Sequence, residues 1–282
     1  MSAFTEANRK AFNDLSASYN SKPWQHKLSQ QVSDALQQRR DWLGVRWTKA
    51  DDGGRDVRLL DYACGTGAIT KALGPYVTTI RGIDISDSMV EKYNEASQSS
   101  GLKPEQGSAV VGDLLSEQVS PQLSGPEYQL FDIAVIGLGF HHFEDPALAI
   151  KRLTERLKPE TGVLVIIDFL PFSDKLARER EQRQQDPSAD FPDMSHTIKH
   201  SGFTREQMQK LYEDGGLEDF GWHVLPDLAV MELKGGTKER TIFIAKGRRS
   251  PTGWGKLRNW FGSMQAQMAG QLSLEPDGRY GS

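Results

Sequence analysis

Cysteine is nearly absent from this sequence of 282 residues, in which Cys64 is the one example. A single thiol excludes an internal disulfide and a multi-cysteine zinc site. Long apolar runs are also lacking, since none approaches the ~20 residues that a membrane-spanning helix needs. Residues 1–6 do not begin the charged and then apolar pattern of a secretory signal. These absences predict a protein of the reducing cytoplasm, without stable membrane insertion.

An excess of basic charge is lacking as well. The chain has 34 lysines and arginines against 38 aspartates and glutamates, which gives a net charge of -4. A nucleic-acid surface needs a basic balance or a basic patch, so we expect no nucleic-acid partner. Hydrophobic residues make up 37% and charged residues 26% of the chain, which is typical of a globular protein. We expect that protein to be a monomer.

What the sequence does contain is an alternation of strands and helices. Apolar residues at three- and four-residue steps predict two helices within residues 1–43, separated at Pro23. Five strands with intervening helices are predicted at residues 57–62, 77–84, 108–111, 131–136 and 163–167. Residues 222–225 and 241–245 are predicted to complete the sheet as an antiparallel hairpin with a short connection. The alternation predicts an α/β fold, with a parallel sheet covered by helices on both faces.

Capping patterns mark two helix starts, and one segment interrupts the alternation. Asp145 stands before Pro146, and Thr204 stands three residues before Gln207. Both arrangements are typical of a helix N-terminus. Residues 171–202 are polar and rich in charge, which predicts an insertion of helix and loop after the fifth strand.

A glycine-rich turn follows the first strand of the sheet. The segment 59–67 reads Leu-Leu-Asp-Tyr-Ala-Cys-Gly-Thr-Gly, so that Asp61 ends the strand and Gly65 and Gly67 allow a close approach of the backbone to a ligand. A dinucleotide fingerprint would need glycine where Thr70 stands, so that interpretation fails. Two further acids, Asp84 and Asp113, end the next two strands.

The turn and the two later acids resemble the motifs of class I S-adenosylmethionine (SAM)-dependent methyltransferases. That resemblance implies a Rossmann-like sheet of seven strands and SAM as the cofactor. Ala63 departs from the family, which usually has glycine there, and we expect a slightly altered turn because alanine prefers negative φ. By the resemblance, Asp61 helps to hold the amino acid end of SAM, Asp84 binds the ribose hydroxyls and Asp113 meets the adenine amino group. The implied cofactor-binding residues are Asp61, Ala63, Gly65, Gly67, Asp84, Ile85, Met89, Asp113, Leu114, Gly137, Tyr19 and Trp24.

Residues 131–146 resemble the fourth motif of the ubiquinone- and menaquinone-methyltransferase branch, which ends in a similar His-His-x-x-Asp-Pro. In this sequence the two histidines are His141 and His142. Either one is a candidate catalytic base, or both are packing or capping groups in a strand-to-helix loop. We expect His141 to lie nearer the cofactor. The strand after this motif departs from the branch at Glu160 and Thr161.

Aromatic residues of the first 24 positions have two interpretations. Phe4, Phe12, Tyr19 and Trp24 can form the core stripe of a helix pair, or they can cover the cofactor as a lid, as in small-molecule members of the family. His196 and His200 have a spacing that can hold a metal, but no third ligand accompanies them, so we predict no metal. The predicted substrate pocket consists of Phe4, Phe12, His141, His196 and His200.

The predicted division of the chain has five parts. They are a helical lid at 1–50, a SAM-binding core at 55–170, a substrate cap at 171–202, the end of the sheet at 203–247 and a tail at 248–282. Residues 254–268 of the tail carry an apolar helical stripe, which docks on its own domain or else binds a membrane or a partner.

The acceptor is predicted from the scarcity of acid–base groups and from the overall resemblance. An acceptor that ionises by itself, such as a thiol, needs little help from a base. The chain is similar to fungal methyltransferases that S-methylate reduced epidithiodiketopiperazines, secondary metabolites such as dithiol gliotoxin. One alternative is C- or O-methylation of a quinone precursor or polyketide. Another is a SAM-binding regulator without catalysis, which a pocket filled by side chains above Gly137 would favour.

Overall fold

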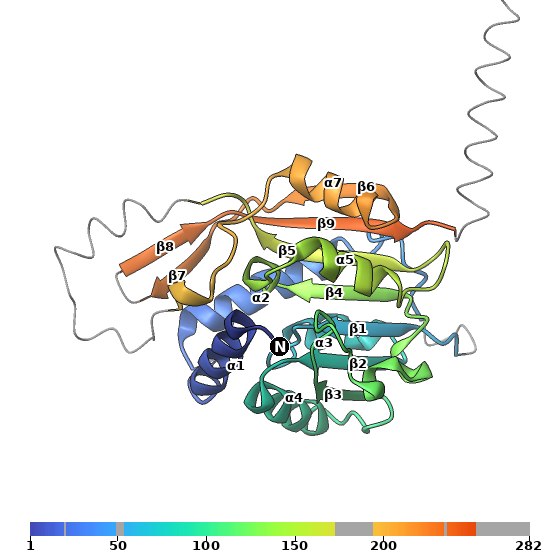
Figure 1. Cartoon of the computed structure of the whole chain (residues 1–282), viewed down its shortest axis with the longest axis horizontal. Coiled ribbons are helices and arrows are strands. Elements are labelled where there is room, and N and C mark those ends of the chain that lie inside the picture. The colour runs from blue at the N-terminus through green and yellow to red at the C-terminus, as the bar shows by residue number, and fades with distance from the viewer. Residues whose placement is uncertain (20, 49–53, 173–193, 234–235, 252–282) are drawn as a thin grey trace, which may run out of the picture. The chain divides into compact units, whose positions relative to one another are not determined.

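The structure, a computed structural model, describes residues 1–19, 21–48, 54–172, 194–233 and 236–251. Its main feature is a sheet of seven strands in the order β3-β2-β1-β4-β5-β9-β6 (Figure 1). The strands of this sheet are β1 (Arg58–Tyr62), β2 (Thr79–Asp84), β3 (Gly107–Val111), β4 (Ile133–Gly137), β5 (Val163–Phe169), β6 (Leu217–Val224) and β9 (Ile242–Arg249). Strands β1 to β5 pair in parallel, and β9 pairs antiparallel with both β5 and β6. The predicted α/β, Rossmann-like fold is confirmed.

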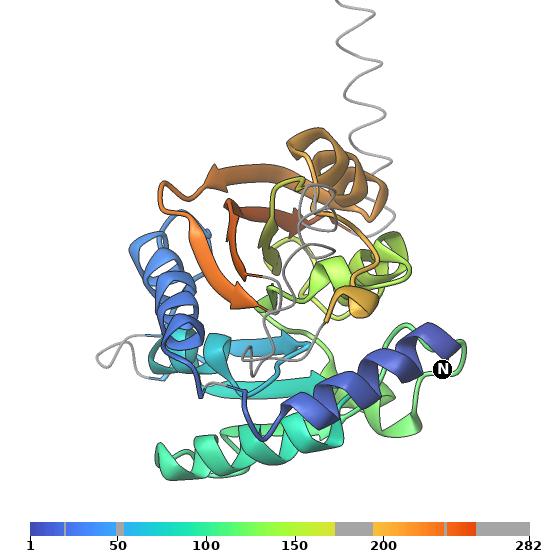
Figure 2. The ribbon, with the colours of Figure 1, turned by 90° about the vertical axis from the view of Figure 1, so that its left-hand side faces the viewer.

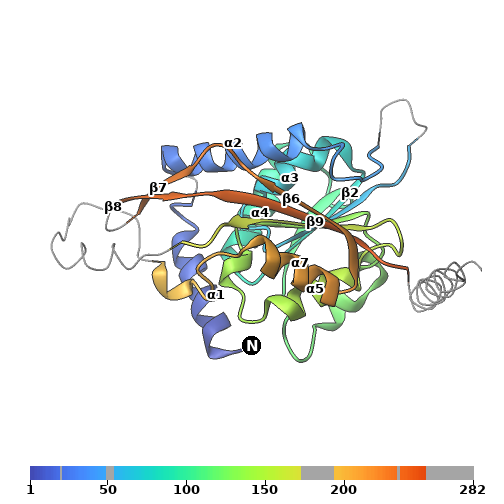
Figure 3. The same cartoon turned by 90° about the horizontal axis from the view of Figure 1, so that it is seen from above.

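Helices cover both faces of this sheet. Figure 3 shows α2 (Pro23–Gln38) and α3 (Ala68–Leu73) on one face, and α5 (Pro146–Thr154) and α7 (Arg205–Asp214) on the other. The described helices also include α1 (Ala3–Leu15), which lies alongside α4 (Asp87–Ser99) in Figure 2.

Alternation along the strands divides the apolar core into two layers. Leu59 on β1 packs in the layer that includes Leu36 of α2, whereas its neighbour Leu60 packs with Leu153 of α5. Successive side chains of a strand point to opposite faces, so a strand that is covered on both faces must be apolar throughout. Strand β5 is such a strand, because all seven of its residues are buried.

The helix starts that the sequence predicts are present. The Asp145 side chain accepts a hydrogen bond from the backbone N–H of Leu148 (2.8 Å), and Pro146 opens α5. Thr204 and Gln207 form a reciprocal capping box at the start of α7. Each cap satisfies backbone donors that a helix leaves without partners.

The predicted connection of the last two strands of the sheet is wrong. Instead of a short link, β6 and β9 are joined through a separate antiparallel pair, β7 (Ala229–Leu233) and β8 (Gly236–Arg240). The pair lies against α2, where Gln31 Nε2 donates to the carbonyl oxygen of Asp227 (2.6 Å). Strand β7 turns the alternating residues Ala229 and Met231 into the core layer that includes Leu36 of α2, whereas β8 is polar.

Two predicted segments fall largely outside the described residues. They are the insertion at 171–202, of which 173–193 are not described, and the apolar stripe of the tail. Within the described part of the chain, no helix is long and apolar enough to cross a membrane.

Candidate active site

The turn after β1 is built on left-handed backbone. Ala63, Gly65 and Gly67 have φ angles of 55°, 50° and 91°. The sequence predicts a slightly altered turn because of Ala63, but this alanine adopts the left-handed conformation that suits glycine. Such a conformation costs an alanine roughly 1–2 kcal/mol, so the backbone at Ala63 is locally strained. A side chain at Gly65 would meet nothing within 4 Å, which shows that this position faces open space.

Two cavities flank the turn. The first cavity, with a volume of about 800 Å³, lies among the residues that follow β1, β2, β3 and β4 and is bordered by α1. The second cavity, of about 690 Å³, lies between α2 and the start of α3. Both are lined by Tyr19, Ala63, Gly65, Gly137 and Leu138.

The first cavity collects most of the residues that the sequence predicts for the cofactor. They are Tyr19, Ala63, Gly65, Asp84, Ile85, Met89, Asp113 and Gly137. Trp24 lines the second cavity. Gly67 and Leu114 line neither: Gly67 is the N-cap of α3, and Leu114 is fully buried.

Backbone donors hold the Asp84 carboxylate in a fixed orientation. One of its oxygens accepts from the N–H of Gly65 and the other from the N–H of Ser86, both at 2.9 Å. A carboxylate has about four lone-pair sites, so these two bonds leave acceptor capacity toward the cavity. Burial raises the pKa of Asp84, and the backbone hydrogen bonds oppose that shift. Asp113 is held in a similar way, with Oδ1 accepting from the N–H of Leu115 (2.8 Å).

Asp61 lies behind the turn and lines neither cavity. It is fully buried, and its Oδ2 accepts from the hydroxyl of Thr70 (2.9 Å), which also lies 2.6 Å from the hydroxyl of Tyr93. Its Oδ1 is buried without a hydrogen-bond partner. Burial raises the pKa of Asp61 to about 8. The predicted contact of Asp61 with the amino acid end of SAM remains a prediction, and here the side chain acts as a buried anchor of α3.

Of the two adjacent histidines, His142 and not His141 lies at the first cavity. His142 lines the first cavity, whereas His141, expected nearer to it, lies behind and is buried. His141 Nδ1 lies 2.8 Å from Oδ1 of Asp168, and its backbone N–H donates to the other oxygen of Asp168 (3.0 Å). The expectation is wrong because this fully buried carboxylate, at the end of β5, holds the His141 ring inward.

His142 has a defined tautomer in this environment. Its Nδ1 lies 2.8 Å from the carbonyl oxygen of Thr197, which can only accept, so Nδ1 carries the proton and Nε2 keeps the lone pair. Burial, with a smaller effect of His141, lowers the pKa of His142 to about 3. The ring also contacts Phe12 of α1 edge-on, at 5.2 Å between centroids.

The remaining residues predicted for the substrate pocket lie outside the two cavities. His200 packs against Phe203 (5.4 Å between ring centroids), and its backbone N–H donates to the carbonyl oxygen of His141 (3.0 Å). His196 belongs to a short 3-10 helix, and Phe4 contacts the Lys199 ammonium group. None of the three lines either cavity. No cluster of potential metal ligands occurs among the described residues.

Sequence reasoning missed several polar residues around the first cavity. The lining includes Thr5 and Asn8 of α1 and Glu144 of the loop after β4. Thr5 donates from Oγ1 to Glu144 (3.2 Å), and Asn8 donates from Nδ2 to the carbonyl oxygen of His142 (3.3 Å). The only indication in the sequence is a polar face on an N-terminal helix, which does not specify a partner.

A family model described as a methyltransferase domain matches residues 24–220. An uncharacterized methyltransferase of Schizosaccharomyces pombe is 30% identical over 163 residues, which are 58% of this chain and 54% of that one. One from Bacillus subtilis is 28% identical over 117 residues, which are 40% and 42% of the two chains. The chain thus spans about half the length of the curated relatives it matches.

Among solved structures, the fold is similar to that of a SAM-dependent methyltransferase from Anabaena variabilis. The TM-score is 0.61 at 19% identity, and the match covers 88% of this chain and 96% of that one. At this identity the likeness is one of fold, and it agrees with the predicted seven-stranded sheet.

Proposed function

The chain belongs to the methyltransferase domain family, and from this premise we propose that it transfers a methyl group from SAM to the sulfur of a small-molecule thiol. Reduced dithiol secondary metabolites of the gliotoxin type are the acceptor class that the sequence resemblance implies.

The first cavity fits the chemical groups of SAM. Asp84 presents a carboxylate with remaining acceptor capacity, which suits a ribose diol. Ile85 and Met89 offer apolar surface to a purine ring, and Asp113 offers an acceptor to its amino group. At Gly65, whose missing side chain leaves open space, the amino acid end can approach the backbone. When bound, SAM supplies an electrophilic methyl group on a sulfonium.

The observation that supports a thiol acceptor is the weakness of the base at the site. His142 is the one imidazole among the described residues that line the cavities. A base whose pKa is about 3 is a poor proton acceptor at neutral pH, since general bases work best with a pKa near the operating pH. Of the carboxylates in the lining, Asp84 and Asp113 are assigned above to the ribose and the adenine of SAM, and Glu144 is exposed and accepts from Thr5. A thiol of pKa ~8.5 supplies its own thiolate, so it needs positioning more than proton removal.

The residues of the chain then act mainly by alignment. Tyr19 borders both cavities, and Phe12 and His142 meet edge-on at the wall of the first. These rings exclude water and limit the approach of the acceptor. Holding two reactants in line can contribute ~7–11 kcal/mol to catalysis.

Two alternatives follow from the same site. C- or O-methylation of a quinone precursor or polyketide would need His142 Nε2 to remove a proton despite its low pKa. A regulator without catalysis would have side chains filling the space at Gly137. The Ile69 side chain lies 2.8 Å from where a Cβ of Gly137 would be, but both cavities still reach Gly137. That opening favours an enzyme.

The test is incubation of the full chain with SAM labelled in its methyl group and a panel of dithiols, phenols and quinols. We expect label transfer to dithiols, with a loss of less than about tenfold for His142→Ala. Transfer only to phenols or quinols, with a loss of about 10²–10⁴-fold for His142→Ala, would assign the alternative acceptor class.

A further inference from the structure

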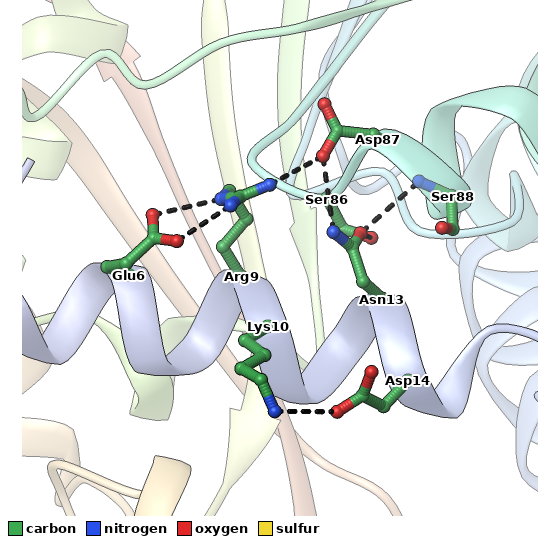
Figure 4. Close-up of polar contacts among 8 residues, drawn as sticks. All are labelled: Glu6, Arg9, Lys10, Asn13, Asp14, Ser86, Asp87 and Ser88. Atoms are coloured by element: carbon green, nitrogen blue, oxygen red, sulfur yellow. Dashed lines mark hydrogen bonds and ion pairs between the residues drawn. The ribbon is translucent and has the colours of Figure 1, made fainter.

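Helix α1 crosses the border of the first cavity and is held at both of its ends. Toward its N-terminus, Thr5 and Asn8 contact the loop that follows β4. Toward its C-terminus, Arg9 and Asn13 contact the first turn of α4 (Figure 4). The helix therefore joins the loops that follow two different strands.

Asn13 contacts a buried group, whereas Arg9 contacts an exposed one. Arg9 Nη1 pairs with Asp87 at 2.6 Å, but 58% of the Asp87 side chain is exposed, so solvent screens this ion pair. Asn13 Oδ1 accepts from the hydroxyl of Ser86 (2.5 Å), which is fully buried, and from the N–H of Ser88 (3.3 Å). Asn13 Nδ2 donates to Asp87 (3.2 Å). Asn13 thus satisfies a buried hydroxyl and an exposed carboxylate together.

Ser86 connects Asn13 to the cavity. The N–H of Ser86 donates to Oδ1 of Asp84 (2.9 Å), and its Oγ accepts from the N–H of Met89 (3.2 Å). A hydroxyl has one proton and two lone pairs. When that proton goes to Asn13, a lone pair remains for Met89, and the position of Ser86 is fixed from both sides. Asp84 and Met89 both line the first cavity.

We propose that Asn13 is a positioning residue: with α1 closed over the cavity, its amide fixes Ser86, and Ser86 orients the Asp84 carboxylate for the ribose hydroxyls. The inference rests on the proposed function, because it assigns the ribose of SAM to Asp84. Coupling between two sites is reciprocal. Cofactor bound at Asp84 therefore stabilises the closed position of α1, and the closed helix strengthens cofactor binding.

The experiment measures the affinity of the full chain for S-adenosylhomocysteine by calorimetry, together with the melting temperature of each variant. Asn13→Ala should weaken binding about three- to tenfold, the effect of losing one hydrogen bond. Lys10→Ala is the matched control, because Lys10 pairs with Asp14 at 3.4 Å rather than with α4, and both side chains are largely exposed (Figure 4). It should bind as the parent does.

A double-mutant cycle separates positioning from a general effect on the lid. If Asn13 acts through Asp84, Asn13→Ala should cost less than twofold when Asp84→Ala is already present, since interacting residues are not additive. An equal loss in both backgrounds would overturn the proposal, as would parent-like affinity of the single variant Asn13→Ala.

An exchange variant keeps the test informative if Asn13→Ala folds poorly. Asn13→Asp combined with Asp87→Asn retains an oxygen acceptor for Ser86 and a donor–acceptor pair between the helices. It should bind S-adenosylhomocysteine within about threefold of the parent, and a loss as large as that of Asn13→Ala would contradict the proposal. Failure of the parent itself to bind would instead refute the proposed function.

Discussion

Asp84 is the residue on which the proposed cofactor site depends most. Its carboxylate lies at the end of β2, fixed by Gly65 and Ser86, with acceptor capacity left toward the cavity. We expect Asp84→Ala to weaken SAM binding by ~1.5–3 kcal/mol, the range for hydrogen bonds that involve a charged group. Calorimetry measures this, with the exposed Glu117→Ala as control. Unchanged affinity in a folded Asp84→Ala protein would remove Asp84 from the site.

Asp61 gives a second prediction at this scale, which concerns stability. Its pKa is about 8 in the folded chain and ~3.9 when unfolded. Between these values the folded chain holds a proton that the unfolded chain has lost, so the stability that Asp61 contributes falls as pH rises from 4 to 8. Asp61→Asn does not titrate. Between pH 5 and pH 8, the free energy of unfolding of Asp61→Asn should therefore rise relative to that of the parent by about 3–4 kcal/mol.

Urea denaturation of both proteins at the two pH values tests this expectation, because other titrating groups cancel in the difference. A difference that stays constant with pH would mean that Asp61 is ionised in the folded chain.

Among the elements, α1 is separable from the core and α2 is not. Residues Val32, Ala35 and Leu36 of α2 belong to a core layer, whereas no residue of α1 belongs to either layer. The contacts of α1 around the first cavity include hydrogen bonds donated by Thr5 and Asn8 to the loop after β4 and by Asn13 to Asp87 at the start of α4. This difference suits a helix that opens and closes while the sheet stays folded.

Deletion of residues 1–16 should therefore abolish turnover and leave the sheet intact. We expect a loss of ~10²-fold or more, because an open site admits water and loses its alignment. Circular dichroism and the melting transition report the fold, and methyl transfer reports the activity. Full activity of the shortened chain would reduce α1 to a packing element.

At the scale of the whole molecule, the sequence predicted the fold better than the site. Apolar strands, glycine turns and capping residues are local signals, and the five parallel strands follow from them. The order of His141 and His142 was not predictable, because successive residues of a 3-10 helix point in different directions and Asp168, which selects His141, lies 27 positions away. That carboxylate has one local signal, as the only acid in an otherwise apolar strand.

The backbone conformation at Ala63 and the contacts of Asn13 could not be predicted from the sequence either. The turn imposes a left-handed conformation on an alanine, against the preference of the residue itself. Asn13 meets Ser86 across 73 positions, and a polar face on a helix does not indicate which distant segment covers it.

The pH dependence of the reaction tests the whole arrangement of cofactor, acceptor and His142. His142 has a pKa of about 3, so it is already deprotonated at every pH above 5, and a reaction that used it as the base would have a flat rate from pH 6 to 8. A thiol acceptor of pKa ~8.5 ionises in that range instead. We expect kcat/KM for a dithiol to rise about tenfold per pH unit from 6 to 8 and to level off above the pKa of the thiol.

The variants His142→Ala and His141→Ala should keep the same pH profile and lose less than about tenfold in kcat/KM, because the thiolate fraction belongs to the acceptor and not to the protein. A flat profile with a loss of a hundredfold or more in His142→Ala, at unchanged affinity for SAM, would mean that a histidine removes the proton and that the acceptor is a hydroxyl or a carbon acid.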